Sequence, residues 1–371
     1  MSNLSLSHLI TAIVFFLLGL FICQLLKFAE TNTVYVGQRK KYNRRGFVLY
    51  IVIFVIFILF VMLQKPSYGL LPYLEVFRAM KTYDVDLFSL NGLYTNEMEP
   101  LFLLWCYIIK FFTNSESAFI FITFSYIWIA VLWFIASYTQ KTRYTVPFMM
   151  MWPVLIDFIF GMRYALAVGH CLIALVTLRK RKYIIAGIFV LIASFTHFLA
   201  FAFFLFIGFY YFVRIFFRRI NSVKTLVILA LGVMVFSNVA FAIYQTFRVS
   251  YRISEEVETN SILSYAPYVL LAVVILYFNR KKNEDHGDNL CALAVYFNML
   301  MIPITISWGI YRLPYLLLLP IVIEISNTFG DRKAYKSILR PIVTFIILVF
   351  SFVKIVTTGV QNMSLDYTFN F

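Results

Sequence analysis

Charged residues are scarce in this chain. Asp, Glu, Lys and Arg make up 13% of its 371 residues, against roughly 25% in an ordinary soluble domain, and 62% of the residues are hydrophobic. Apolar stretches near the length of about 20 residues that a bilayer-spanning helix needs recur along the whole chain. The composition therefore excludes a soluble protein, and we expect residues 1–371 to form a single transmembrane domain.

The motifs of several enzyme classes are also missing. The chain contains no GxGxxG, GxxxxGK[ST], HExxH or GxSxG pattern, so nucleotide-binding, zinc-protease and serine-hydrolase functions lack their residues. The four cysteines lie in apolar segments without CxxC-like spacing and are expected to be buried packing residues. Asp84-Val85-Asp86 is a lone DxD pair, and exposed carboxylates are ordinarily just solvated. We expect no metal and no cofactor.

Long apolar segments are what the chain has instead. We predict an all-α polytopic membrane helical bundle with about 11–13 membrane segments, some of them short or re-entrant. The segment that starts at residue 8 follows no basic region and no cleavage site of a signal peptide, so it is expected to stay as an anchor. The candidate segments are 8–29, 46–64, 99–113, 118–138, 144–161, 163–178, 183–197, 198–213, 224–247, 262–278, 290–308, 313–327 and 341–359.

The formal net charge of +15 comes from short basic clusters between these segments. Such spacing is a topology signal, because cytoplasmic loops of membrane proteins are enriched in Lys and Arg, and it argues against binding of nucleic acid. The clusters expected in the cytoplasm lie in loops 39–45, 179–182, 214–224, 280–282 and 332–340. The loops at 65–98 and 247–261 are then expected on the outer face.

The run 183–213 lies between two cytoplasmic clusters, so it has to cross outward and return. The turn is expected near His197, with two limbs of about 15 residues, at the short end for a span. The front half has a conflict, since full crossings by both 99–113 and 118–138 would put Lys141 outside. We expect 99–113 to be re-entrant.

The outer loop 65–98 contains an amphipathic segment. At 100° per residue, Tyr73, Val76, Phe77 and Met80 share one helical face, and Arg78 lies opposite. We expect an interfacial helix that lies flat on the outer surface of the membrane.

Several ionisable side chains lie in or beside the apolar segments, where they are functional candidates by default. The topology places His197 at the outer face together with four arginines. Guanidinium groups stay charged and bind oxyanions bidentately, so such a cluster suits a phosphate or diphosphate. The candidate diphosphate-binding residues are Arg163, Arg312, Arg248, Arg252 and, on the interfacial helix, Arg78.

Each candidate has an alternative role. Arg163 could reach the membrane interface, and Arg248 and Arg252 could pair with nearby glutamates. His197 could be hydrogen-bonded scaffolding. His170, two turns deeper on the same face as Arg163, is expected to bond to a neighbouring helix.

Two carboxylates are expected near the same face. Asp157 and Glu99 could orient or deprotonate a hydroxyl, as could His197, and these three are the catalytic candidates. Either carboxylate could equally be an ion-pair partner for the arginines. The residues alone do not decide between these roles.

An ordered series of segments resembles the Wzy-type and EpsG-like family of bacterial polysaccharide polymerases. The series is "YLEVFRAM", "EPLFLLWCYIIKFF", "FIFGMRYALAVGHCLIAL" and "RKRKYIIAGIFVLIASFTHFLAFAFFLF", over residues 45–215, with "YRLPYLLLLP" matching more loosely. The resemblance implies a GT-C-like architecture in the bacterial cytoplasmic membrane, with the active site on the periplasmic or outer side.

The resemblance also implies an activity. Members transfer a growing glycan from undecaprenyl diphosphate to the non-reducing end of a lipid-linked oligosaccharide repeat unit, for O-antigen, capsule or exopolysaccharide, without a nucleotide sugar. The implied partners are these lipid-linked oligosaccharides, membrane lipid and a chain-length regulator. The alternatives are a flippase for lipid-linked oligosaccharide, which the short limbs of 183–213 would suit, and an O-antigen ligase-like GT-C transferase.

Overall fold

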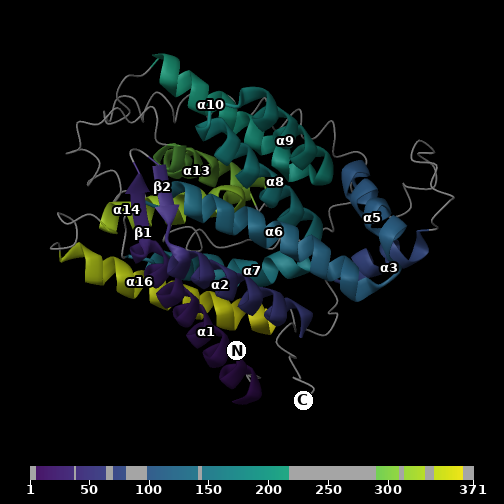
Figure 1. The fold of residues 1–371 in the computed structure, drawn as a ribbon, viewed down its shortest axis with the longest axis horizontal. Helices are drawn as coiled ribbons and strands as arrows, with labels where there is room; N and C mark the ends of the chain where they lie inside the picture. The colour runs from purple at the N-terminus through teal and green to yellow at the C-terminus, as the bar shows by residue number, and fades with distance from the viewer. Residues whose placement is uncertain are drawn as a thin grey trace. The chain divides into compact units, whose positions relative to one another are not determined.

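The computed structural model describes residues 6–36, 39–63, 70–80, 98–140, 144–216, 290–308, 313–330 and 338–361. The chain divides into two compact units, Met1–Phe201 with Phe329–Phe371, and Ala202–Thr328. Within the first unit, helices from both ends of the sequence lie side by side (Figure 1).

Almost every element is a helix. Among the described residues, five helices are long and apolar enough to cross a bilayer, which confirms the all-α polytopic fold class. The α-helices of the first unit are α1 (Leu6–Thr31), α2 (Arg44–Met62), α3 (Leu71–Ala79), α5 (Pro100–Phe112), α6 (Glu116–Tyr138), α7 (Met151–Phe160), α8 (Met162–Arg179), α9 (Tyr183–Thr196) and α16 (Leu339–Gln361). The second unit contains α10 (Ala202–Phe216), α13 (Leu290–Trp308) and α14 (Leu318–Gly330), whose last residues belong to the first unit. Short 3-10 helices are η2 (Val146–Met150), η3 (Phe198–Phe201) and η6 (Leu313–Leu317).

The predicted apolar segments correspond to these helices with boundaries that differ by a few residues. Segments 144–161, 198–213 and 313–327 are each divided into a 3-10 helix and an α-helix, namely η2 and α7, η3 and α10, and η6 and α14. Segments 224–247 and 262–278 and the predicted outer loop 247–261 lie outside the described residues. The count of 11–13 membrane segments, the single transmembrane domain and the side of the membrane on which each loop lies stay predictions.

A small hairpin joins α1 to α2, and the sequence patterns did not predict it. Strands β1 (Thr33–Val36) and β2 (Arg39–Tyr42) pair antiparallel, so the basic loop expected at 39–45 is partly a strand. The buried carboxylate of Glu30 at the end of α1 accepts hydrogen bonds from Tyr42 at 2.8 Å and from Tyr50 of α2 at 2.6 Å. These bonds fix the hairpin against both helices.

Lipid-facing and buried helices differ in their exposure. Helix α8 is buried along nearly its whole length, because α6, α7 and α9 pack around it. Helices α1, α2 and α16 instead expose large apolar side chains such as Phe21, Phe47 and Phe345. An exposed apolar face suits a helix in contact with lipid. Because its neighbours cover it on all sides, α8 is the central helix of this unit.

Helix α3 has the amphipathic character that the sequence predicts. Tyr73, Val76 and Phe77 are buried, whereas Glu75 and Arg78 are exposed. The helix contacts α5 and α6, and Figure 1 shows it beside α5. Its position on the outer membrane surface stays a prediction.

Helix α5 is short. Its 13 residues give a length of about 20 Å, less than the ~30 Å hydrocarbon core of a bilayer. The length fits the prediction that segment 99–113 does not cross the membrane.

Candidate functional site

The break after α9 explains the isolated histidine. Ser194 and Thr196 each donate their hydroxyl to the carbonyl four residues earlier, at 2.9 and 2.7 Å, so both polar side chains are satisfied inside the helix. His197 then adopts an extended backbone with φ −154° and ψ 126°, and the helix ends. The histidine thus lies at the junction of α9 with η3.

The first amides of η3 are held by side chains. The N–H groups that open a helix have no carbonyl partner within it. Here the Leu199 N–H donates to Nδ1 of His197 at 3.2 Å, and the Phe198 N–H donates to Oε1 of Glu99 at 3.3 Å. A residue from the start of α5, 99 positions away, therefore closes this junction.

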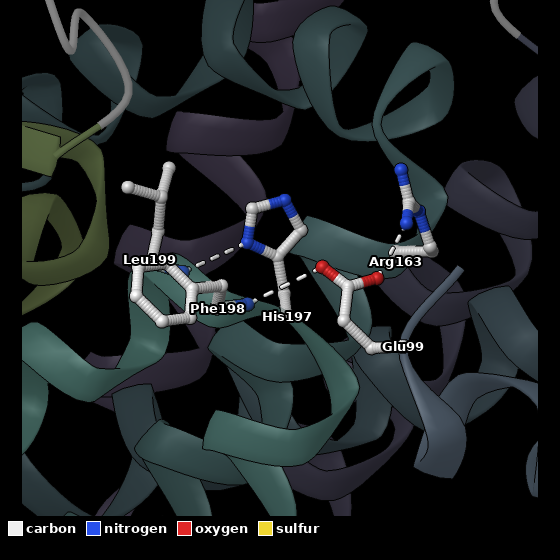
Figure 2. Close-up of polar contacts among 5 residues, drawn as sticks. All are labelled: Glu99, Arg163, His197, Phe198 and Leu199. Carbon is white, nitrogen blue, oxygen red and sulfur yellow. Dashed lines mark hydrogen bonds and ion pairs between the residues drawn. The ribbon is translucent and has the colours of Figure 1, made fainter. Parts of the chain in front are cut away.

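Glu99 also forms an ion pair with Arg163. The guanidinium Nη1 donates to Oε2 of the carboxylate, and Figure 2 shows Glu99 between Arg163 and the His197 junction. The side chains are 18% exposed for Arg163 and 10% for Glu99. Because Glu99 makes no capping bond to its own helix, its side chain is directed to these two partners.

Two aromatic rings surround this group. The Tyr73 ring of α3 lies beneath the Arg163 guanidinium, with 5.7 Å between the guanidinium carbon and the ring centroid. The Tyr164 ring meets His197 edge to face, with centroids 5.4 Å apart. Both tyrosines are buried, so they fix the positions of the charged and polar groups.

The protonation of His197 follows from its contact. Since Nδ1 accepts the Leu199 N–H, a neutral imidazole carries its proton on Nε2. In this form His197 is a hydrogen-bond donor through Nε2 and has no lone pair available to act as a base. Of the side chains of Glu99, Arg163 and His197, the carboxylate of Glu99 is the one whose chemistry suits it to accept a proton.

A known protein family matches most of the chain. The EpsG family model matches residues 47–369. The chain belongs to the EpsG family. No curated protein and no solved structure matches it.

Membership supports a membrane protein of the polysaccharide-polymerase type, as the resemblance implied. The match includes Tyr73, Glu99, Arg163 and His197, so the whole contact group lies inside the family region.

The structure brings three of the predicted site residues of this EpsG-family protein together. Glu99, Arg163 and His197 come from α5, α8 and the end of α9. Of the two roles left open for Glu99, the ion pair with an arginine is present. His170, expected to bond to another helix, does so, since its Nδ1 lies 2.5 Å from the Tyr126 hydroxyl of α6.

Arg78 lies outside this group, and the side chains of the remaining predicted residues are outside the described part of the structure. Arg78 forms a bidentate ion pair with Glu116 at the start of α6, with Nη2 to Oε2 at 2.8 Å. Asp157 lies in α7, and its side chain is outside the described part of the structure. Arg248, Arg252 and Arg312 are outside the described residues, as is the Asp84-Val85-Asp86 pair.

Two contributors to the site were not expected. The Phe198 amide has no side-chain signature in the sequence, and Tyr73 was assigned only to an apolar face. The free, buried cysteines confirm the packing role expected for them. Within the described residues, no group of three or more His, Cys, Asp or Glu side chains is placed to hold a metal ion.

Proposed function

We propose that this EpsG-family protein is a glycosyltransferase that polymerises lipid-linked oligosaccharide repeat units. It transfers a growing glycan from undecaprenyl diphosphate to the non-reducing end of an incoming lipid-linked unit. The reaction takes place at the outer face of the bacterial cytoplasmic membrane. The observation that supports this proposal is the convergence of a guanidinium, a carboxylate and an imidazole at the α9–η3 junction.

Arg163 binds the diphosphate in this proposal. A guanidinium has five N–H donors in a planar fork and binds oxyanions bidentately. Such a group is suited to the oxygens of a diphosphate, whose charge grows as the glycosidic bond to it breaks. His197 supplements Arg163 by donating its Nε2 proton.

Glu99 contacts the acceptor hydroxyl. The acceptor oxygen forms a bond to the anomeric carbon while the bond from that carbon to the diphosphate oxygen breaks. The hydroxyl proton passes to the Glu99 carboxylate and then to solvent. The ion pair with Arg163 holds this carboxylate in a fixed orientation.

The remaining predicted residues complete the proposal. Arg248, Arg252 and Arg312 stay candidate diphosphate ligands on the sequence alone, and Asp157 stays a candidate acidic group. A diphosphate is already a good leaving group, so positioning of the two lipid-linked substrates provides most of the rate enhancement. A chain-length regulator is the expected protein partner.

Replacement of Arg163 tests this proposal in cells that lack the native protein. We expect Arg163→Ala to leave a single repeat unit on the acceptor, because the developing negative charge loses its main partner. The measurement is the length distribution of the surface glycan, together with the amount of membrane-inserted protein. Arg163→Lys is expected to restore short chains only, since an ammonium cannot make a bidentate contact.

Arg45→Ala is the matched control, since Arg45 is an exposed arginine at the start of α2. It is expected to support full-length chains. Long chains in Arg163→Ala would overturn the assignment. Complete loss of surface glycan in the deletion strain would instead indicate a flippase, and polymer retained on the lipid carrier would indicate a ligase.

A further inference from the structure

Helix α3 is attached to the rest of the first unit by contacts along its whole length. The Phe77 ring stacks on Phe119 of α6, with centroids 4.5 Å apart and planes inclined by 12°. The Nζ of Lys110, from α5, lies 4.7 Å from the centroid of the same ring. Tyr73 meets Phe102 of α5 edge to face at 5.5 Å. The helix is thus seated on α5 and α6.

Tyr73 connects helix α3 to the candidate site. Its ring faces the Arg163 guanidinium at 5.7 Å, within the range of a cation–π contact. Glu99 binds the same guanidinium through Nη1. The guanidinium is therefore held by a carboxylate from α5 and by a ring from α3, which together restrict its orientation.

Arg78 lies one turn and a half further along α3 and faces away from this group. Its bidentate contact with Glu116 joins the C-terminal end of α3 to the N-terminus of α6. Hydrogen bonding to Glu116, followed by its charge, raises the pKa of Arg78 above its usual value, so the pair stays ionised. The side chains are 54% and 33% exposed, and such a pair contributes modestly to stability.

We propose that Tyr73 is a positioning residue for Arg163, and that the Arg78–Glu116 ion pair holds Tyr73 in place instead of binding the diphosphate. This inference rests on the proposed function, because it takes Arg163 as the diphosphate ligand. It assigns α3 to the site as a supporting element. Arg78 is accordingly removed from the set of ligands that its charge alone suggested.

The first test measures binding of inorganic pyrophosphate to the full-length protein in detergent. Tyr73→Leu is expected to weaken binding about 3- to 10-fold, since the ring contact with the cation is lost. Tyr73→Phe, which keeps the ring, is expected to bind within about twofold of the unchanged protein. Tyr183→Leu is the matched control, because Tyr183 is exposed at the opposite end of α9 from His197.

The outcomes separate the inference from the proposed function. If Arg163→Ala abolishes binding and Tyr73→Leu binds like the unchanged protein, the role of Tyr73 is wrong and the function stands. If Arg163→Ala does not alter binding, the diphosphate assignment itself fails. If both Tyr73 variants weaken binding equally, the ring contact is not what positions Arg163.

The second test exchanges the charges of the exposed pair, which does not disturb the buried face of α3. Arg78→Glu is expected to weaken pyrophosphate binding about 2- to 5-fold, and the double variant Arg78→Glu with Glu116→Arg is expected to restore it. A direct ligand at position 78 would not be restored by an arginine at position 116. Failure of the double variant to recover binding would therefore contradict the inference.

Discussion

At the scale of single residues, the polar groups of the candidate site are interdependent. Glu99 accepts one bond from Arg163 and one from the Phe198 amide, while His197 accepts the neighbouring amide of Leu199. Removal of one partner leaves the other group buried without its bond, which is more costly than loss of an exposed contact. Their substitution is therefore informative only when the amount of folded protein is measured as well.

Glu99→Gln tests the carboxylate specifically. The amide keeps the size of the side chain and an oxygen for the Phe198 N–H, but it loses the negative charge and the proton acceptor. We expect the rate of polymer formation to fall by about 100-fold or more, with a protein amount within about twofold of the unchanged chain. The measurement is the initial rate of glycan elongation in isolated membranes.

Glu116→Gln is the matched control for this prediction, since it neutralises a glutamate that the structure places outside the contact group. It is expected to reduce the rate only a few-fold, through its effect on α3. Equal rates for the two variants would contradict the role assigned to Glu99.

The sequence predicted part of this arrangement. The basic clusters on both sides of 183–213 placed the helix break near His197, and α9 ends at Thr196. The ion pair of Glu99 with Arg163 remained one of two alternatives, because charge patterns do not determine which distant carboxylate meets which arginine. The Phe198 amide and the ring of Tyr73 could not be predicted, since these contacts depend on tertiary packing.

At the scale of elements, the site depends on where helices end. Glu99 precedes α5, Arg163 lies in the first turn of α8, and His197 follows α9, so each functional side chain is at a helix terminus.

Helix periodicity predicts the helices, but it did not predict the hairpin β1–β2, because the basic strand β2 resembles a charged loop in composition. The hairpin is held by a close approach of α2 to the end of α1.

Gly46 is where this approach occurs. A Cβ there would lie 2.7 Å from the backbone carbonyl oxygen of Asn32, so the backbone would have to shift. We expect Gly46→Ala to destabilise the protein by about 1–3 kcal/mol and to lower its unfolding temperature in detergent. The measurement is thermal unfolding of the purified protein.

Gly187→Ala is the control, because a Cβ at Gly187 in α9 meets nothing within 4 Å. Alanine also has the higher helix propensity, so this variant is expected to keep or raise the unfolding temperature. Equal unfolding temperatures for the two variants would contradict the close approach.

At the scale of the whole molecule, the orientation of the unit can be argued from its contacts. Tyr73 meets Phe102 near the start of α5, and Phe77 meets Lys110 near its end. Helix α5 therefore runs alongside α3. If α3 lies on the outer surface, as its amphipathic face predicts, then both ends of α5 lie on that side and α5 does not cross the membrane.

Cysteine labelling with a membrane-impermeant maleimide checks this orientation, since the native cysteines are all buried. Asn114→Cys, at an exposed position between α5 and α6, is expected to be labelled in intact spheroplasts. Lys182→Cys, in the basic cluster before α9, is expected to be labelled only after permeabilisation. Labelling of position 114 only after permeabilisation would show that α5 crosses the bilayer.

The central claim is that this protein joins glycan units with release of a lipid diphosphate. The most direct measurement reconstitutes the purified protein in liposomes with a lipid-diphosphate-linked oligosaccharide and follows both products. The account predicts polymer, with one lipid diphosphate released for each new linkage, and neither product with Arg163→Ala. Transfer of the oligosaccharide across the bilayer without elongation and without release of lipid diphosphate would contradict it.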